Sequence, residues 1–536
     1  MSAASRLTLA LVVSCAVGFI SLSLEIVWFS AFSFAAESRA GMFGFALGAF
    51  LFGIGGGAWL GFRQCARKNT EPFLFIAAVL MIAAAVNFLG IPVISKIVVL
   101  ADGILVQFGN SRILNTAVFL AFQLGSMFLV AFFLGGVLPV LCEGGFGNRT
   151  GDKDGYADGQ IGQFTSWVYA ANILGATTGP LLTGFVLMSR YSLDQMLLAA
   201  SAALLVLGLA VLLAAPSRPR QRIGGVVAAT LLAAGMGFGY PALYGGQTLE
   251  RIHFKNAFRP DTRFKHKVHN RSGIVAIQAD PRGDIIYGHG IYDGRFNLDP
   301  VNDSNGITRA YAFATLHRNP KDMLEIGLSG GSWARVVLDY PKVKSMTVVE
   351  INPGYFEVIR KYPENATILN DPRVTYYIDD GRRWLNRNPD RKFDFILINT
   401  TFHWRENITN LLSEEFLRLG QAHLNPGGVM YWNTTDSKDV IYTASTVFKY
   451  VVRFAGFVAG SDSPFDMTVA EKRKALLSYR NNGKSIFRPE DEKSREVLER
   501  LSNHPFVNVR DRFLAGGHRL ITDDSMASEF KRPWWY

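Results

Sequence analysis

The chain has 536 residues and a formal net charge of +11, and its charged residues are unevenly spread. That length corresponds to about three or four domains of ordinary size. The first 240 residues hold 22 Lys, Arg, Asp and Glu, whereas the remaining 296 hold 77. Since about a quarter of the residues of a water-soluble domain are charged, only the second half has such a composition. A purely soluble protein and a purely membrane-embedded one are both excluded.

The distribution of basic residues and cysteines excludes two classes of site. Lys and Arg occur along both halves instead of forming one stripe, so nucleic acid is not expected as a partner. The three cysteines, Cys15, Cys65 and Cys142, all lie in or beside apolar segments of the first half. A disulfide framework or zinc site in the second half is therefore excluded, and we expect no metal.

Apolar stretches long enough to cross a bilayer recur along the first half. About 20 apolar residues cross the hydrocarbon core as a helix. Seven stretches meet this requirement: 7–34, 41–62, 73–94, 114–141, 164–188, 193–215 and 223–243. We therefore predict a transmembrane domain of about seven helices over residues 1–243, with the lipid bilayer as its partner.

Two features of these spans go beyond hydrophobicity. Glycines recur at about four-residue spacing along the second stretch and favour close helix packing; they are Gly44, Gly48, Gly53, Gly57 and Gly61. Glu25 lies within the first stretch, where a carboxylate is costly unless it faces a partner or a polar cavity. A structural ion pair and a functional role both remain open for Glu25.

The positive charges of the loops do not agree on the orientation of the chain in the membrane. With seven spans, the loops on the N-terminal side hold most of the basic residues of the first half, which favours a cytoplasmic N-terminus. The soluble half would then lie outside. The basic run from Arg251 to Arg271, just after the last span, favours the opposite orientation.

After residue 243 the pattern changes to that of a soluble protein. We predict a basic juxtamembrane linker over 244–271, a β-hairpin subdomain over 272–322, an α/β domain over 323–460 and a charged C-terminal extension over 461–536. Within the α/β domain, short apolar runs at 323–326, 345–351, 374–378, 393–398 and 429–432 alternate with helical stretches, and 440–454 is predicted to be a last helix. This alternation is typical of a doubly wound, parallel sheet whose ligand lies at the carboxyl ends of its strands.

The residues at three consecutive strand ends predict an adenosine-type ligand. The first strand runs into a turn of small residues, Gly327, Ser329, Gly330 and Gly331, which lets the backbone approach a ligand. The second ends in Glu350, 23 residues after Gly327, where a carboxylate can accept both hydroxyls of a ribose. The third ends in Asp379 and Asp380, suited to accept a hydrogen bond from an adenine amino group. Each signal is weak alone, and the three in register are specific.

Several motifs of the soluble half, taken in order, resemble the spermidine synthase (polyamine aminopropyltransferase) family. They are Tyr292-Asp293-Gly294, the glycine turn, and the segments 348–353, 371–374, 380–382, 393–398 and 424–429. The resemblance implies a Rossmann-like S-adenosylmethionine-type fold, with S-adenosylmethionine or its decarboxylated form as co-substrate. The membrane half resembles the major-facilitator-like region fused to some members, through segments 24–28, 135–139 and 169–176, the last of which contains Asn172. Segment 520–524 is also similar to that branch.

The departures from the family lie on the side of the acceptor amine. In the synthases an aspartate at the end of the fourth strand deprotonates the amine, and here that position is Asn399. The family's His-Glu pair falls on Thr308 and Arg309, so a cation replaces a carboxylate that would hold a polyamine. We therefore expect ordinary putrescine to be a poor substrate.

The loop that follows Asn399 is dense in functional groups. His403 and Glu406 are candidates for the catalytic base beside Asn399. Trp404 could stack on the cofactor, and a lid with a core-packed Trp is the alternative. Substrate-binding roles are further expected for Tyr292, Asp293, Arg309 and Thr400.

Two functions follow from these observations. The first is an integral membrane transferase that moves an aminopropyl, methyl or related group to a small-molecule or membrane-borne acceptor. The second is a transporter or sensor whose synthase-like domain binds a nucleoside without catalysis, with Glu25 and Asn172 as its polar membrane residues. We expect location in a bacterial inner membrane, with the soluble half in the cytoplasm because S-adenosylmethionine is a cytosolic metabolite. The sequence leaves a homodimer open.

Overall fold

The protein is described by a computed structural model that covers residues 3–66, 71–107, 112–144, 158–399, 402–525 and 527–531. The chain forms two compact units. The first contains Met1–Ala36 and Gly41–Arg263, and the second contains Glu37–Ala40 and Phe264–Pro533.

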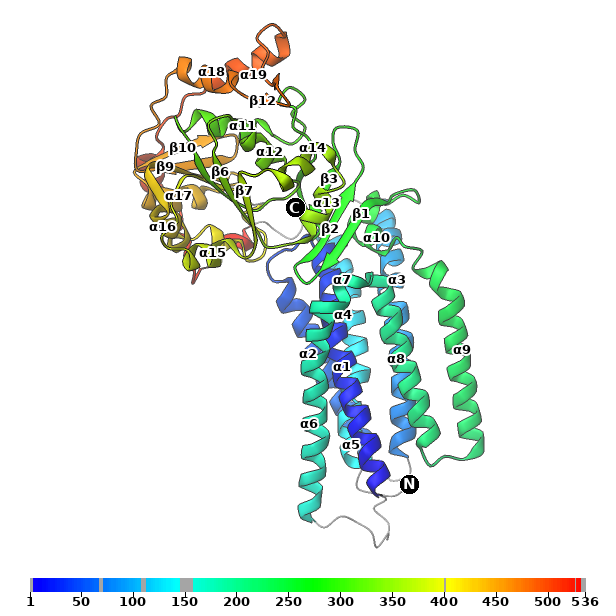
Figure 1. Ribbon diagram of the computed structural model, residues 1–536. Helices are drawn as coiled ribbons and strands as arrows, with labels where there is room; N and C mark the ends of the chain where they lie inside the picture. The colour runs from blue at the N-terminus through cyan, green and yellow to red at the C-terminus, as the bar shows by residue number, and fades with distance from the viewer. Residues whose placement is uncertain are drawn as a thin grey trace. The chain divides into compact units, whose positions relative to one another are not determined.

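The first unit is helical (Figure 1). Its long helices are α1 (Ala3–Ala35), α2 (Met42–Cys65), α3 (Pro72–Gln107), α4 (Arg112–Gly135), α6 (Asp158–Leu182), α8 (Leu193–Ala214) and α9 (Pro219–Leu243). The short ones are α5 (Val137–Gly144), η1 (Thr183–Leu187), α7 (Met188–Arg190), α10 (Thr248–Phe254) and η2 (Lys255–Ala257). Within the described residues, seven segments are long and apolar enough to cross a membrane. The prediction of about seven spans agrees with this count.

Small residues set the helix packing of the first unit. A side-chain carbon added to Gly57 of α2 would collide with the backbone of Phe132 in α4, and one added to Gly175 of α6 would collide with Cys15 in α1. The predicted glycine stripe is used only in part, because the positions of Gly44 and Gly48 face open space. Close backbone approach without a hydrophobic driving force is how helices associate in lipid.

Several polar side chains between these helices donate hydrogen bonds to neighbouring helices. The Trp28 indole N–H donates to Asn87 Oδ1 at 3.0 Å, and Asn87 Nδ2 donates to Ser201 Oγ at 2.8 Å. Asn172 Nδ2 donates to the Ser14 carbonyl at 3.1 Å, so this residue joins α6 to α1. Glu25 is half-buried and has no hydrogen-bond or ion-pair partner among the described residues.

The second unit contains two main β-sheets (Figure 1). An antiparallel sheet has the order β1-β2-β3-β4, from β1 (Phe264–Asn270), β2 (Gly273–Gln278), β3 (Ile285–Gly288) and β4 (Ile291–Arg295). The larger sheet has seven strands in the order β10-β11-β9-β8-β5-β6-β7. These are β5 (Asp322–Ile326), β6 (Ser345–Glu350), β7 (Val374–Ile378), β8 (Phe393–Ile398), β9 (Leu424–Asn433), β10 (Tyr450–Phe454) and β11 (Phe457–Ser461).

The larger sheet has the doubly wound arrangement that the alternating pattern predicts. Strands β5 to β9 pair in parallel, and β11 is antiparallel to β9. The chain leaves β5 toward β6 and β7 and then returns to the other side of β5 with β8, which makes a topological switch point between β5 and β8. A parallel sheet of short apolar strands must be covered on both of its faces. Two buried apolar clusters that include residues of these strands are present.

Short helices connect and cover the strands of the second unit. They are α11 (Thr308–Tyr311), η3 (Ala312–Thr315), α12 (Ser332–Leu338), α13 (Gly354–Ile359), α14 (Pro363–Ala366), η4 (Thr367–Asn370), α15 (Gly381–Arg387), η5 (Ile408–Leu411), α16 (Glu414–Ala422), α17 (Lys438–Val447), α18 (Val469–Leu477), α19 (Glu492–Ser502), α20 (Arg510–Leu514) and η6 (Ala527–Phe530). A two-stranded ribbon, β12 (Arg480–Asn481) and β13 (Lys484–Ser485), follows α18.

The boundaries of the elements differ from the sequence-based ones in three places. Residues 244–271 do not form a separate linker: they include α10 and the whole of β1, which pairs with β2. The helix expected over 440–454 ends at Val447, because residues 450–454 pair with β11 as strand β10. The extension predicted over 461–536 packs against the α/β domain, since Leu476, Tyr479 and Leu498 lie in the buried core of that domain.

The turn between α1 and α2 belongs to the second unit. Ser38 Oγ donates to the His289 carbonyl at 2.9 Å, and the Ser38 carbonyl accepts the N–H of Glu406 at 2.8 Å. The Arg39 guanidinium lies 5.7 Å from the ring centroid of Trp404. The turn Glu37–Ala40 thus contacts both the β3–β4 turn and the loop that follows β8.

Candidate functional site

The turn after β5 brings backbone groups to the switch point of the larger sheet. Gly327 has φ +87° and Gly331 has φ +71°, a left-handed conformation that favours glycine. A side-chain carbon on Gly327 would lie 2.8 Å from the Asn399 carbonyl oxygen, so the turn also needs glycine for the close approach of the β8 end. The predicted cluster Gly327, Ser329, Gly330 and Gly331 is thus placed at the carboxyl end of β5, beside the end of β8.

Glu350 lies at the carboxyl end of β6, and its carboxylate is almost completely buried. Its Oε2 accepts the N–H of Leu328 at 2.7 Å, and its Oε1 accepts the N–H of Asn352 at 2.7 Å. Burial raises the pKa of Glu350 to about 7, although these two hydrogen bonds favour the ionised form. Each oxygen keeps a lone pair for a further donor, which is what a ribose diol requires.

The two aspartates after β7 have different local roles. Asp379 is paired with Arg383, and its second oxygen lies 3.7 Å from Arg387. Asp380 caps the N-terminus of α15, where its Oδ1 accepts the N–H of Arg383 at 2.8 Å. The Oδ2 of Asp380 has no partner among the described residues, so it can accept a hydrogen bond from a ligand.

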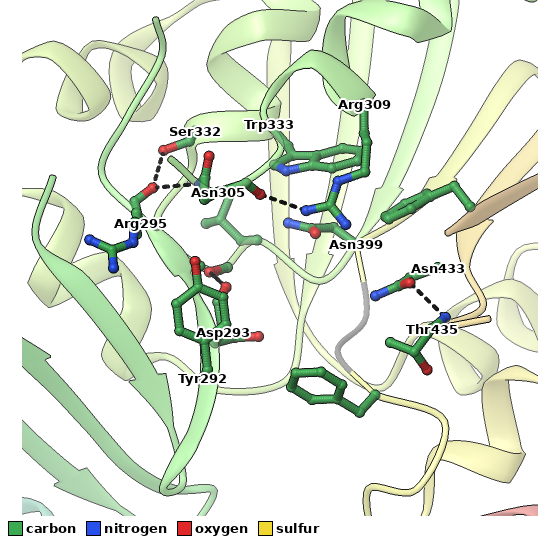
Figure 2. Close-up of a pocket in the computed structure, with 16 residues that line it drawn as sticks. Tyr292, Asp293, Arg295, Asn305, Arg309, Ser332, Trp333, Asn399, Asn433 and Thr435 are labelled. Atoms are coloured by element: carbon green, nitrogen blue, oxygen red, sulfur yellow. Dashed lines mark hydrogen bonds between the residues drawn. The ribbon is translucent and has the colours of Figure 1, made fainter. Parts of the chain in front are cut away.

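A pocket opens beside the glycine turn, between β4 and the carboxyl ends of β5, β8 and β9 (Figure 2). Asp293 of β4 lines it, and a hydrogen bond from the Tyr355 hydroxyl holds its carboxylate. Burial raises the pKa of Asp293, while the positive charge of Arg405 and the Tyr355 hydrogen bond act in the opposite direction. Among the described residues that line this pocket, Asp293 is the only carboxylate.

Two guanidinium groups also line the pocket. Arg295 is paired with Asp280 at 2.8 Å. Arg309 instead donates from Nε to the Gly306 carbonyl at 2.9 Å and from Nη2 to the Asn305 carbonyl at 2.6 Å. Figure 2 shows the Arg309 guanidinium next to the Trp333 ring and beside Asn399.

The predicted catalytic residues are not all brought to this pocket. Asn399 lines it, as do the predicted substrate-binding residues Tyr292, Asp293 and Arg309. His403 lines a second hollow with Asp439 and His518, and its Nδ1 lies 2.5 Å from Thr435 Oγ1. Glu406 is not among the lining residues of either pocket, and burial raises its pKa. Thr400 lies outside the described residues.

Trp404 packs into the protein rather than facing the pocket. It is 4% exposed and stacks on Phe402 with ring centroids 4.9 Å apart, and Arg39 covers its ring. Of the two interpretations of this loop, the structure favours the one in which the Trp is a packing residue.

Three further residues contribute to the site without having been predicted. Tyr355 orients Asp293, Asn305 supplies a carbonyl to Arg309, and the charge of Arg405 acts on both Asp293 and Glu350. Tyr355 lies on α13 after the Glu350 strand, and Asn305 precedes the Thr308–Arg309 pair. Proximity to those motifs was the available signal, but neither residue belongs to a recognisable spacing pattern.

Comparisons with known proteins show what part of the second unit is similar to. Residues 311–480 match the model of the spermine/spermidine synthase domain. The polyamine aminopropyltransferase of Corynebacterium efficiens is 29% identical over 184 residues, which cover 33% of this chain and 34% of that protein. The same enzyme of Streptococcus pneumoniae is 35% identical over 118 residues, covering 22% of this chain and 41% of that protein. The chain thus matches less than half the length of these two curated relatives.

A solved structure of low similarity is also matched. The spermidine synthase of Thermotoga maritima is 20% identical with a TM-score of 0.33, and the match covers 51% of this chain and 85% of that one. By its sheet order, the second unit is a Rossmann-like α/β domain with a topological switch point between β5 and β8. Residues 311–480 of this unit are similar to the spermine/spermidine synthase domain, and they stand in one chain with seven candidate membrane spans among the described residues.

Proposed function

We propose that the second unit binds S-adenosylmethionine or its decarboxylated form and transfers an aminopropyl, methyl or related group to an acceptor near the membrane. The observation that carries this proposal is the buried Glu350 carboxylate at the end of β6, beside the glycine turn of β5. Glu350 would accept the ribose hydroxyls, and Asp380 Oδ2 would accept the adenine amino group. The residues present therefore fit an adenosine-type co-substrate.

The chemistry asks little of the protein beyond positioning, because a sulfonium is already an activated leaving group. The lone pair of the acceptor forms a bond to the carbon next to sulfur. The carbon–sulfur bond breaks, and its electron pair stays on sulfur as a neutral thioether. An amine acceptor then loses a proton. We assign Asp293 as the acceptor of that proton, because it is the one carboxylate among the described lining residues and Asn399 cannot take a proton near neutral pH.

The pocket is poorly suited to putrescine. A diamine carries two positive charges near neutral pH, and Arg309 adds a third at the acceptor side of the pocket. Like charges in a partly desolvated pocket repel one another. Putrescine is therefore a poor acceptor under this proposal.

Placement near the membrane is supported by the chain itself. The turn Glu37–Ala40, which joins two candidate spans, contacts the loop after β8 within the second unit. We further propose that the protein lies in a bacterial inner membrane with the synthase-like domain in the cytoplasm, where S-adenosylmethionine is made.

Turnover of the full chain in detergent tests the transferase proposal. The protein is incubated with membrane lipid extract and either form of the co-substrate. Release of S-adenosylhomocysteine or methylthioadenosine, lost in Asp293→Asn, is the expected result. Nucleoside binding with no release in any extract would overturn it.

A second candidate function is a transporter or sensor in which the nucleoside binds without turnover. It is favoured by Asn399, which cannot act as a base, and by Glu25, which has no partner among the described residues of the membrane unit. Solute uptake that depends on Glu25 in proteoliposomes, without release of a nucleoside product, would support it. Uptake unchanged in Glu25→Gln would count against it.

A further inference from the structure

Arg309 is fixed in the pocket by several independent contacts. Its Nε and Nη2 donate to the carbonyls of Gly306 and Asn305 at 2.9 and 2.6 Å. Its Cζ lies 5.1 Å from the ring centroid of Phe457 and 5.9 Å from that of Trp333. A side-chain carbon on Gly306 would lie 2.6 Å from Arg309 Nε, so glycine is needed there for the guanidinium to lie where it does. The arginine is preorganised by its surroundings.

The charge of Arg309 is not neutralised by the protein. Among the described residues, no carboxylate lies within ion-pair distance of it, and its Nη1 donates to no protein atom. The other guanidinium of the pocket, Arg295, does have such a partner in Asp280. A planar guanidinium with an unused edge is the group that proteins use to bind a carboxylate through two parallel hydrogen bonds.

The same pocket offers acceptors for a positively charged group. Asp293 lines another part of its wall (Figure 2). The Asn305 side-chain oxygen is buried and has no hydrogen-bond partner in the part of the chain that the structure describes, while the Asn305 Nδ2 donates to the Arg295 carbonyl at 3.3 Å. A buried carbonyl oxygen without a partner is costly, and a ligand N–H would remove that cost. The pocket thus has one place for an anion and one for a cation.

We propose that Arg309 binds a carboxylate of the ligand, so that this pocket takes the amino-acid end of a molecule rather than a polyamine. This inference rests on the proposed function and names its ligand class. The carboxylate has two sources with the same chemistry. It belongs to S-adenosylmethionine itself, which would make that compound and not its decarboxylated form the co-substrate, or it belongs to an amino-acid acceptor.

Binding measurements on the full chain in detergent distinguish these sources. Titration calorimetry compares S-adenosylmethionine with decarboxylated S-adenosylmethionine, which differ only in the carboxylate. A second pair of titrations, with methylthioadenosine bound, compares 4-aminobutyrate with putrescine. Each is repeated for Arg309→Gln, for Arg309→Lys, which keeps the charge and loses the planar fork, and for Arg360→Gln, a control on an exposed arginine after α13.

The expected result is a preference of about 10- to 100-fold for the carboxylated member of one pair, the range of a charge-assisted hydrogen bond. Arg309→Gln removes the preference, Arg309→Lys reduces it and Arg360→Gln retains it. Gly306→Ala, which displaces the guanidinium without deleting it, also removes it. The pair that shows the preference identifies the source of the carboxylate.

Two results would overturn the inference, and they differ in what else they affect. The first is that either nucleoside binds but neither pair shows a preference, or that the preference survives in Arg309→Gln. In that case Arg309 does not bind a carboxylate, while the proposed transferase function stands. If no co-substrate binds at all, the proposed function fails together with the inference.

Discussion

Replacing Glu350 by glutamine should sharply weaken the binding of an adenosine-type ligand. Glu350 accepts two backbone N–H groups at 2.7 Å, from Leu328 and Asn352. Glutamine has one acceptor and one donor at the same positions, so one buried N–H would face an NH₂ group at a cost of about 1–3 kcal/mol. One charge-assisted hydrogen bond to the ribose is lost as well, worth about 1.5–3 kcal/mol. The ribose term alone lowers affinity about 10- to 100-fold.

Titration calorimetry of S-adenosylmethionine against the full chain in detergent measures this effect. Glu357→Gln is the matched control, because Glu357 lies exposed on α13, seven residues away along the chain. Thermal unfolding of both variants separates a loss of affinity from a loss of folding. Equal affinities for Glu350→Gln and the wild type, with both folded, would refute the assignment of Glu350 to the ribose.

Four further predictions rest on particular contacts. Burial raises the pKa of Glu350 to about 7, and the ionised form is the one that accepts ribose hydroxyls. Nucleoside affinity should therefore be greatest above pH 7 and fall by up to about tenfold per pH unit below it. Calorimetry between about pH 5.5 and 8.5 checks this. The same shift gives the unliganded protein a contribution to stability from Glu350 that is present in full below pH 4.5 and is lost as the pH rises through 7. Thermal unfolding should show this dependence in the wild type but not in Glu350→Gln. Gly327→Ala forces alanine into a left-handed φ at a cost of about 1–2 kcal/mol and brings its Cβ against the Asn399 carbonyl. Ligand binding should therefore weaken. An unchanged dissociation constant would show that the turn can shift. Trp404→Ala should lower the free energy of unfolding by about 3–5 kcal/mol, and Trp404→Phe should lower it much less, as measured by thermal unfolding. If the substitutions reduced ligand affinity and left stability unchanged, Trp404 would contact the ligand instead.

Local patterns were sufficient to predict the sheet and its ligand-facing edge. The runs that became β5, β6, β7 and β8 are apolar and short, and a parallel sheet must bury such strands on both faces. Once the strands are known, the carboxyl-end rule places Gly327, Glu350 and Asp380 at one edge without knowledge of any side-chain contact. The seven candidate spans could likewise be predicted from the sequence, because length and hydropathy alone define them.

Contacts between distant parts of the chain could not be predicted from the sequence. Trp404 is covered by Arg39, and no spacing rule connects residues so far apart in sequence. Residues 450–454 continue a helical pattern after α17, and only pairing with β11 makes them a strand. From the sequence, the loop after Asn399 is predicted to carry a cluster of catalytic side chains. In the structure, however, His403 contacts Thr435 and Trp404 packs into the interior.

The most direct test of the adenosine site is an experimental structure of the full chain with methylthioadenosine bound. We expect the ribose hydroxyls within hydrogen-bond distance of Glu350, the adenine amino group at Asp380, and the thioether side of the ligand directed toward Asp293 and Arg309. A nucleoside bound elsewhere on the second unit, with Glu350 contacting only Leu328 and Asn352, would contradict it.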